Sequence, residues 1–204
     1  MNNILIPYPF NKSEKSLIAI HSKTHDDWTK TTFDAIKSNI ISHLRLQQSN
    51  LCCYCKYPLG FDIKQVDIEH IVPKSQYPKF SFHCKNLALS CPACNTKKST
   101  KSVLNKAITN YPRNGSNFKI VHAHFDDYST HIDIFDNCVF IAKTTKGSET
   151  ITCCELFRLS TVEQRVKAFK VPEESLVQRL IVELTDEGSN ALDSLISIIR
   201  PLLK

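Results

Sequence analysis

The chain has 204 residues, of which 42% are hydrophobic and 23% charged, a composition typical of a folded globular protein. That length is sufficient to bury a core, either as one compact unit or as a small domain with appendages. No apolar run approaches the roughly 18–20 residues of a membrane span, and the start of the chain lacks the basic and apolar segments of a signal peptide. We therefore expect a cytoplasmic protein without a membrane partner.

The positive charge is concentrated in one segment. Residues 51–111 contain nine lysines and three acidic residues, which accounts for the whole formal net charge of +6, because the remainder has 17 basic and 17 acidic residues. A locally basic surface attracts a polyanion, and nucleic acid is the expected one. The alternative is that these lysines are only solvated on an exposed face.

Residues 26–48 are predicted to form a helix near the N-terminus. Apolar side chains recur there at steps of three and four residues, namely Phe33, Ile36, Ile40 and Leu44. Asp26 or Asp27 is the expected cap at its start.

Two Cys-x-x-Cys pairs follow, Cys52 with Cys55 and Cys91 with Cys94. Each pair supplies two thiolates from one tight bend, so two pairs complete the tetrahedral shell of a structural zinc ion. Cys53 is an alternative to Cys52, His83 and Cys84 are weaker substitutes, and the bland interpretation is a coincidence of spacing. The other cysteines are expected to be small buried hydrophobes: Cys53, Cys84, Cys138, Cys153 and Cys154.

The segment between and after the pairs is predicted to hold two short strands and a helix. The strands are expected at residues 64–69 and 87–90, and the helix at 92–104. The connection between the strands carries Pro73 and Pro78 and is expected to be irregular.

The second half of the chain begins at a break over residues 111–116. Alternating apolar residues at 118–124, 131–135 and 139–142 predict a small β region. From Ser160 the pattern becomes helical, with Glu163 completing a capping box, an end at Pro172, and two further apolar stripes at 176–184 and 192–202. The expected division is a helical arm at 1–50, a core at 51–111, a β extension at 112–159, and C-terminal helices at 160–204 that form a candidate partner surface.

An acid and a histidine lie together at the end of the first predicted strand. A histidine ordinarily titrates near neutral pH and can take a proton from water, which makes His70 a candidate base, and Glu69 can hold a hard divalent cation through oxygen. Asn95 offers a neutral oxygen ligand in the first turn of the predicted helix, directly after Cys94. Taken alone, His70 would be an ordinary strand histidine. The cysteine pairs around it favour a catalytic centre.

These motifs resemble the HNH endonucleases. The resemblance covers about residues 51–104 and is carried by Cys-x-Tyr-Cys, Glu-His-Ile-Val-Pro-Lys, Asn-Leu-Ala-Leu-Ser-Cys and Cys-Asn-Thr-Lys-Lys. It implies an α+β fold with a ββα-metal finger and a four-cysteine zinc knuckle. It also implies that His70 is the general base, that Asn86 orients the finger loop or the base, and that Asn95 is a metal ligand. Glu69 stands where the family commonly has Asp, so its side chain is one methylene longer.

A further resemblance is to the PtuB-like HNH subunits of Septu-type and retron-associated anti-phage systems. It rests on Glu-His-Ile-Val-Pro-Lys-Ser-Gln-Tyr-Pro with the block from Asn86 to Asn95, and on the segments 146–151 and 156–165. It implies a P-loop ATPase partner from a neighbouring gene. This chain has four glycines and no Gly-x-x-x-x-Gly-Lys motif, so a nucleotide-driven step would need such a partner.

The main functional hypothesis is metal-dependent hydrolysis of a nucleic-acid phosphodiester, with DNA as the expected substrate. Glu69 and Asn95 would hold Mg²⁺, or Mn²⁺ in vitro, while four lysines grip phosphates without reading sequence: Lys74, Lys97, Lys98 and Lys101.

Three alternatives stay open at this point. The zinc knuckle could be a binding module for nucleic acid or protein that does not cut, or the chain could be an HNH restriction endonuclease that acts alone. A different metal site could also form where His122 and His124 alternate, with nearby polar partners at Asp126, Asp127 and His131. The bland interpretation of that group is partly exposed strand and turn residues.

Overall fold

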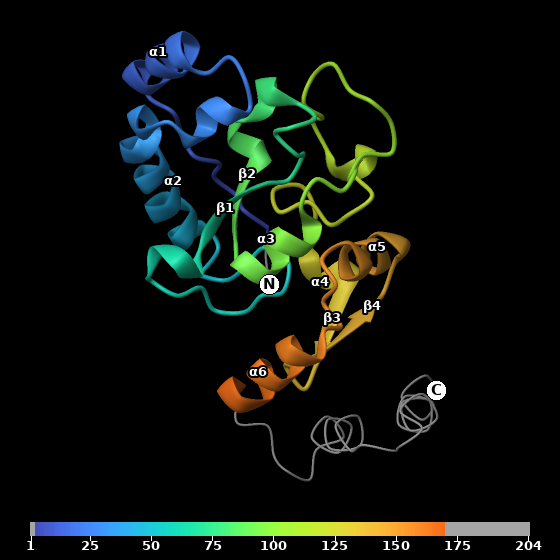
Figure 1. Ribbon diagram of the computed structural model, residues 1–204. Coiled ribbons are helices and arrows are strands. Elements are labelled where there is room, and N and C mark those ends of the chain that lie inside the picture. Colours follow the sequence, from blue (N-terminus) through green and yellow to red (C-terminus); the bar gives the residue numbers. More distant parts are fainter. Residues whose placement is uncertain (1–2, 170–204) are drawn as a thin grey trace. The chain divides into compact units, whose positions relative to one another are not determined.

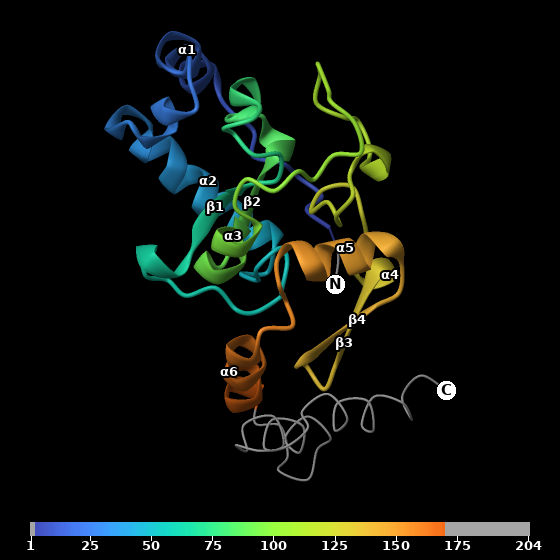
Figure 2. The same ribbon diagram turned by 45° about the vertical axis from the view of Figure 1, so that its right-hand side comes forward.

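The computed structural model describes residues 3–169, and Figures 1 and 2 show its ribbon from two directions. Within this range the chain forms two units. The first runs to Ile132 and also includes Ala142–Glu155, and the second consists of Asp133–Ile141 and the chain from Leu156. The candidate site lies in the first unit. The four-part division expected from the sequence stays a prediction.

The N-terminal part contains two α-helices. α1 (Lys12–His21) begins with a capping box, in which the Asn11 side chain accepts from the backbone N–H of Glu14 and the Glu14 side chain accepts from that of Asn11. α2 (Asp34–Gln47) buries Ile36, Ile40 and Leu44, as its apolar spacing predicts.

The N-terminal helix was predicted to begin at residue 26, but α2 begins at Asp34. Residues Asp26–Thr29 and Thr31–Phe33 are short 3-10 turns, separated by an extended Lys30. Asp27 does not cap α2, because its Oδ2 accepts from the backbone N–H groups of Lys23 and Thr24 at 2.7 and 2.8 Å. It therefore stabilises the loop before the turns.

A two-stranded antiparallel sheet forms the centre of the first unit. β1 (Asp67–His70) pairs with β2 (Leu87–Ser90), with Asp67 opposite Ser90 and His70 opposite Leu87. All four residues of β2 are buried. α3 (Pro92–Lys98) follows β2 directly, so the elements come in the order β1-β2-α3 along the chain (Figure 1). Both α2 and α3 contact the sheet. The predicted α+β fold class is confirmed.

Two boundaries near the sheet differ from the prediction. β1 begins at Asp67 and not at residue 64, since Ile63–Gln65 is a 3-10 turn. α3 ends at Lys98 and not at 104, because Ser99 adopts φ = 47°, a left-handed conformation that cannot continue a helix.

The second half contains less strand than predicted. No strand forms at 118–124, where the described chain has one isolated bridge from Phe118 to Leu104 and then turns, with Phe125 N–H and Asp126 N–H donating to the His122 carbonyl. The other two predicted strands and the predicted C-terminal helix are present. They and their neighbours are α4 (Tyr128–His131), β3 (Ile132–Phe135), β4 (Val139–Ala142), α5 (Thr145–Cys153) and α6 (Leu159–Phe169).

α6 begins at Leu159, so Ser160 lies inside the helix and not at its cap. Pro172 and the stripes at 176–184 and 192–202 lie outside the described residues. Among residues 3–169, no helix has the length and apolar character needed to cross a membrane.

The side chain of Asn86 stabilises the irregular connection between β1 and β2 by hydrogen bonds. Its buried side chain donates through Nδ2 to the carbonyls of Val72 and Phe80, at 3.1 and 3.0 Å. Its Oδ1 accepts from Val72 N–H at 2.7 Å and from the Tyr111 hydroxyl at 3.1 Å. One amide thus holds both ends of the connection and the segment after α3.

We expect Asn86→Ala to lower the free energy of unfolding by about 2–4 kcal/mol, because it leaves several buried polar groups unpaired. Asn105→Ala is the matched control, since it removes only an exposed hydrogen bond to the Ser116 carbonyl. Urea unfolding would measure both variants. An Asn86→Ala protein as stable as the control would contradict the anchoring role.

Candidate active site and zinc centre

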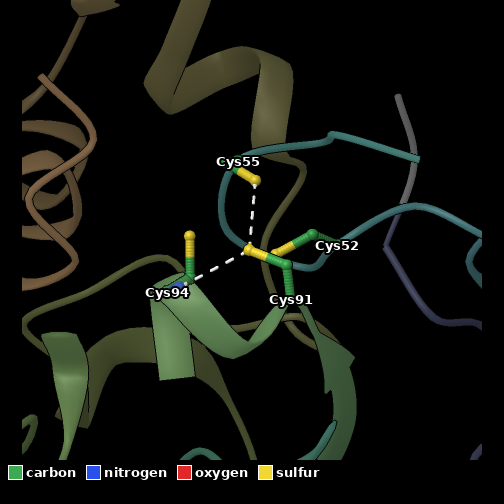
Figure 3. A group of neighbouring side chains, drawn as sticks. All are labelled: Cys52, Cys55, Cys91 and Cys94. Carbon is green, nitrogen blue, oxygen red and sulfur yellow. Dashed lines mark hydrogen bonds between the residues drawn. The ribbon is translucent and has the colours of Figure 1, made fainter. Parts of the chain in front are cut away.

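Four cysteines lie close together, two from the segment after α2 and two from the start of α3. The Sγ atoms of Cys52, Cys55, Cys91 and Cys94 all lie within 4.8 Å of one another (Figure 3). A tetrahedral zinc ion with Zn–S bonds of about 2.3 Å needs sulfurs about 3.8 Å apart, and Cys55 Sγ lies 3.8 Å from Cys91 Sγ. The cluster therefore fits a structural zinc ion. Neither Cys53, Cys84 nor His83 belongs to this group.

Each pair of cysteines is held by its local backbone. In the first pair, Lys56 N–H donates to the Cys52 carbonyl at 3.0 Å and Lys56 adopts φ = 54°. In the second, Cys94 N–H donates to Cys91 Sγ at 3.5 Å, so this thiol acts as the cap of α3. Cys53 N–H donates to the Leu89 carbonyl at 2.9 Å, which ties the first pair to β2.

Without a metal, the thiols of the cluster differ in pKa. Burial opposes ionisation of Cys52, but hydrogen bonds from Cys53 and from the other three thiols hold its pKa well below the ordinary value, whereas the hydrogen bond with Cys52 raises the pKa of Cys55 and of Cys94. Metal binding would therefore have to displace the remaining thiol protons. A thiolate is the form that binds zinc.

We expect Cys94→Ala to lower the zinc content below one ion per chain and to unfold the core, because zinc binding supplies on the order of 10 kcal/mol to such sites. Cys84→Ala is the control, since Cys84 is outside the cluster. Elemental analysis and circular dichroism of both variants check this. Full zinc occupancy in Cys94→Ala would disprove the assignment.

Glu69 is a buried carboxylate with one partner, Tyr54, between Cys52 and Cys55 and a second, Lys98, at the end of α3. Lys98 Nζ lies 2.6 Å from Glu69 Oε1, and the Tyr54 hydroxyl donates to the same oxygen at 3.0 Å. The side chains of Glu69 and Lys98 are each 1% exposed. Burial raises the pKa of Glu69, and the ion pair with Lys98 and the hydrogen bond from Tyr54 oppose that rise. Both bonds end on Oε1, so neither of them engages Oε2.

His70 has a defined tautomer. Its Nε2 lies 3.0 Å from the Ser81 carbonyl, which can only accept, so Nε2 carries the proton. The Trp28 ring packs against the imidazole edge-on, with ring centroids 4.4 Å apart. Burial lowers the pKa of His70 to about 3. Near neutral pH the imidazole is therefore neutral, and Nδ1 is the ring atom able to accept a proton.

Asn95 faces a residue that the sequence motifs did not single out. Its Nδ2 donates to Asp67 Oδ2 at 2.9 Å. Asp67 and Glu69 are two residues apart on β1 and so point to the same face of the strand. Asn95 and Lys98 are three residues apart on α3 and likewise lie on one face of the helix. The Asp-x-Glu spacing was the available signal, because it places both carboxylates on the face that meets α3.

The predicted centre borders one cavity. Glu69, His70 and Asn95 all line a cleft of about 1000 Å³ in the first unit. Asp67, Lys74 and Lys98 line it too. His70 and Glu69 are adjacent, yet both reach the cleft because His70 is the last residue of β1.

The four lysines expected on phosphates occupy different environments. Lys74 lines the cleft and its Nζ donates to the His25 carbonyl at 3.4 Å. Lys97 and Lys101 are partly exposed and lie 2.8 and 3.6 Å from Glu155 carboxylate oxygens. Lys98 differs from the expectation of a surface lysine, because it is buried on Glu69 and also donates to the His70 carbonyl at 2.9 Å.

The alternative metal site around His122 does not form. His122 Nε2 bonds the Tyr111 hydroxyl at 2.9 Å, and His124 Nε2 donates to the Leu87 carbonyl at 2.8 Å. Asp126 instead accepts from His122 N–H and from Lys146. Among residues 3–169, the four-cysteine cluster is the group found with metal-ligand geometry. His122 and His124 are buried structural residues and not partly exposed strand residues.

Burial lowers the pKa of His124 to about 4, below the ordinary 6.5. The unfolded chain then binds more protons, so the free energy of unfolding falls as the pH falls from about 6.5 towards 4. Between pH 6.5 and pH 5, the free energy of unfolding of His124→Gln should fall by about 1–2 kcal/mol less than that of the wild type. Urea unfolding at both pH values measures this, with Asn105→Ala, which removes no titratable group, as the control that keeps the wild-type difference. An unchanged pH dependence in His124→Gln would reject the explanation.

Comparisons with known proteins match the segment that carries the cysteine pairs and the candidate site. Residues 52–101 match the family model of the HNH endonuclease. Septu protein PtuB from Bacillus thuringiensis is 31% identical over 111 residues, which is 54% of this chain and 38% of that protein. A protein named as a candidate HNH endonuclease of retron Vc95 from Vibrio cholerae is 33% identical over 82 residues, which is 39% of each chain. The chain thus spans less than half the length of these relatives. The matches confirm the HNH resemblance of the core and its likeness to the PtuB-like proteins.

Proposed function

We propose that this chain is an HNH endonuclease that hydrolyses phosphodiester bonds in DNA with the help of a divalent cation. The observation that carries the proposal is the meeting of Glu69, His70 and Asn95 at one cleft, within the segment that matches the HNH family model. A non-catalytic zinc module has no use for a neutral buried imidazole beside a carboxylate and an amide at a common cavity.

His70 acts as the general base in this proposal. Ser81 holds the proton on Nε2, so Nδ1 takes the proton from the water that attacks phosphorus. The edge-on contact with Trp28 limits rotation of the ring. Because burial keeps the imidazole neutral, the base is in its competent form at neutral pH without a preceding deprotonation.

Glu69 and Asn95 would hold the catalytic cation, Mg²⁺ or Mn²⁺, through oxygen atoms that such ions prefer. The atoms that fit are Glu69 Oε2, since Oε1 is already bound by Lys98 and Tyr54, and Asn95 Oδ1, since Nδ2 donates to Asp67. The bound cation would neutralise charge on the phosphate and on the leaving 3′ oxygen. Zinc, in contrast, would occupy the four-cysteine cluster as a structural ion.

The lysines contribute in two ways. Lys74, at the cleft, and Lys97 and Lys101, just beyond the second cysteine pair, are suited to contact flanking phosphates without reading sequence. Lys98 acts inside the site, where it compensates the buried charge of Glu69. Its effect on the phosphate is therefore through the carboxylate.

The biological role we propose is that of a cytoplasmic effector in an anti-phage defence system, with a P-loop ATPase as its partner. The similarity to Septu protein PtuB and to the retron Vc95 protein supports this role. Nucleotide hydrolysis would have to come from the partner, since this chain lacks the Gly-x-x-x-x-Gly-Lys motif.

We expect His70→Ala to reduce DNA cleavage by roughly 10²–10⁴-fold, because it removes the base while the zinc cluster and the sheet persist. A plasmid-nicking assay with Mg²⁺ or Mn²⁺ would measure it, with and without a P-loop ATPase of the proposed partner type. His43→Ala is the control, since His43 lies on α2 and bonds the Ile6 carbonyl.

Two results would count against the proposal. Full activity in His70→Ala would remove the base assignment, and a wild-type protein that binds DNA but never cuts it, alone or with the ATPase, would favour the binding module. Cleavage that needs no partner would favour a restriction endonuclease that acts alone.

A further inference from the structure

Two cross-links join β1 to α3 at the candidate site. Asp67 accepts from Asn95 at 2.9 Å, and Glu69 pairs with Lys98 at 2.6 Å. The spacing of two residues on the strand matches the spacing of three on the helix, so the links lie side by side on one face. Each residue proposed to hold the cation is therefore bound by a second residue of complementary chemistry.

The first cross-link determines which end of the Asn95 amide faces the cleft. An ionised carboxylate has only acceptor atoms, so the amide nitrogen must point to Asp67. The amide oxygen is then turned away from Asp67 and is available to a cation. Without this partner the amide could rotate by half a turn and present its N–H₂ group, which repels a cation.

The same residue also sets the formal charge of the site. Glu69 and Lys98 cancel each other, because their ion pair is buried and close. Asp67 then supplies the remaining negative charge beside the two proposed ligands, and it lines the same cleft. A neutral residue in its place would leave the three linked side chains at positions 67, 69 and 98 with zero net charge, which is poorly suited to attract a divalent cation.

We infer that Asp67 is a positioning residue of the cation site, which orients the Asn95 amide through its carboxylate and gives the site its net negative charge. This inference rests on the proposed function, because it takes Glu69 and Asn95 as the ligands. Asp67 need not touch the substrate or the cation to have this effect. Partners that orient metal ligands typically change metal affinity by about 10–100-fold when removed.

The test compares Mn²⁺ binding by four proteins with their zinc retained: wild type, Asp67→Ala, Asp67→Asn and Glu69→Gln. Isothermal titration with Mn²⁺ alone gives the affinity without reference to cleavage. Elemental analysis and circular dichroism verify one zinc per chain and an intact fold. Asp67→Asn keeps the shape of the side chain and one acceptor oxygen, so it gives a folded variant if Asp67→Ala does not.

We expect Asp67→Ala to bind Mn²⁺ about 10–100-fold more weakly than wild type, and Asp67→Asn to lie between the two. The Mn²⁺ concentration for half-maximal cleavage should rise in the same order, while the rate at saturating Mn²⁺ changes less in Asp67→Asn. Asp34→Asn is the matched control: Asp34 lines the same cleft and loses the same charge, but its carboxylate pairs with Lys37 at 2.6 Å and not with Asn95. Its Mn²⁺ affinity should stay within about twofold of wild type.

The possible outcomes distinguish a failure of the Asp67 role from a failure of the proposed cation site. Weaker binding in Glu69→Gln with wild-type binding in both Asp67 variants would overturn the role of Asp67 and leave the cation site intact. Equal losses in Asp67→Asn and Asp34→Asn would also overturn it, since general charge in the cleft would then explain the effect. If wild type and Glu69→Gln bound Mn²⁺ equally, the ligand assignment itself would fail, and the role of Asp67 with it.

Discussion

The buried carboxylate of Glu69 is the interaction on which the rest of the site depends. Removing a carboxylate from water costs several kcal/mol unless a partner of opposite charge and good hydrogen bonds replace the solvent. Lys98 and Tyr54 supply these, the first from the end of α3 and the second from the bend between Cys52 and Cys55. Because Lys98 and Tyr54 belong to the two segments that carry the cysteine pairs, the cysteine cluster holds the surroundings of Glu69 in place. The cysteine cluster and the candidate active site are thus linked by two side chains.

The loop between the strands performs the corresponding task for His70. Asn86 holds the loop through Val72 and Phe80, and the loop returns to place the Ser81 carbonyl on the imidazole. The imidazole is therefore oriented by backbone that a single buried amide keeps in position. Such preorganisation lets a base act without rearranging its surroundings. In this proposal the HNH core consists of a carboxylate fixed by the zinc segments and a histidine fixed by the loop.

Local patterns predicted the parts of the molecule that depend on residues near one another in sequence. The Cys-x-x-Cys pairs, the strand at 87–90 and the apolar face of α2 follow from spacing alone, and all three are present. The strand expected at 118–124 is absent, although its residues alternate. There the carbonyl of His122 accepts two backbone N–H groups in a turn, and its side chain bonds Tyr111, so tertiary partners replaced the strand ladder.

The sequence by itself determined the chemical inventory of the site: four thiols for zinc, and a carboxylate, an imidazole and two amides in the order typical of the HNH family. Only the tertiary structure decided how these groups are used. It placed Lys98 on Oε1 of Glu69 and not on the surface, and it brought Asp67 to Asn95 across 28 positions of sequence. The reason is physical. Spacing along a strand or helix determines the face on which a side chain lies, whereas its partner depends on which other element packs against that face.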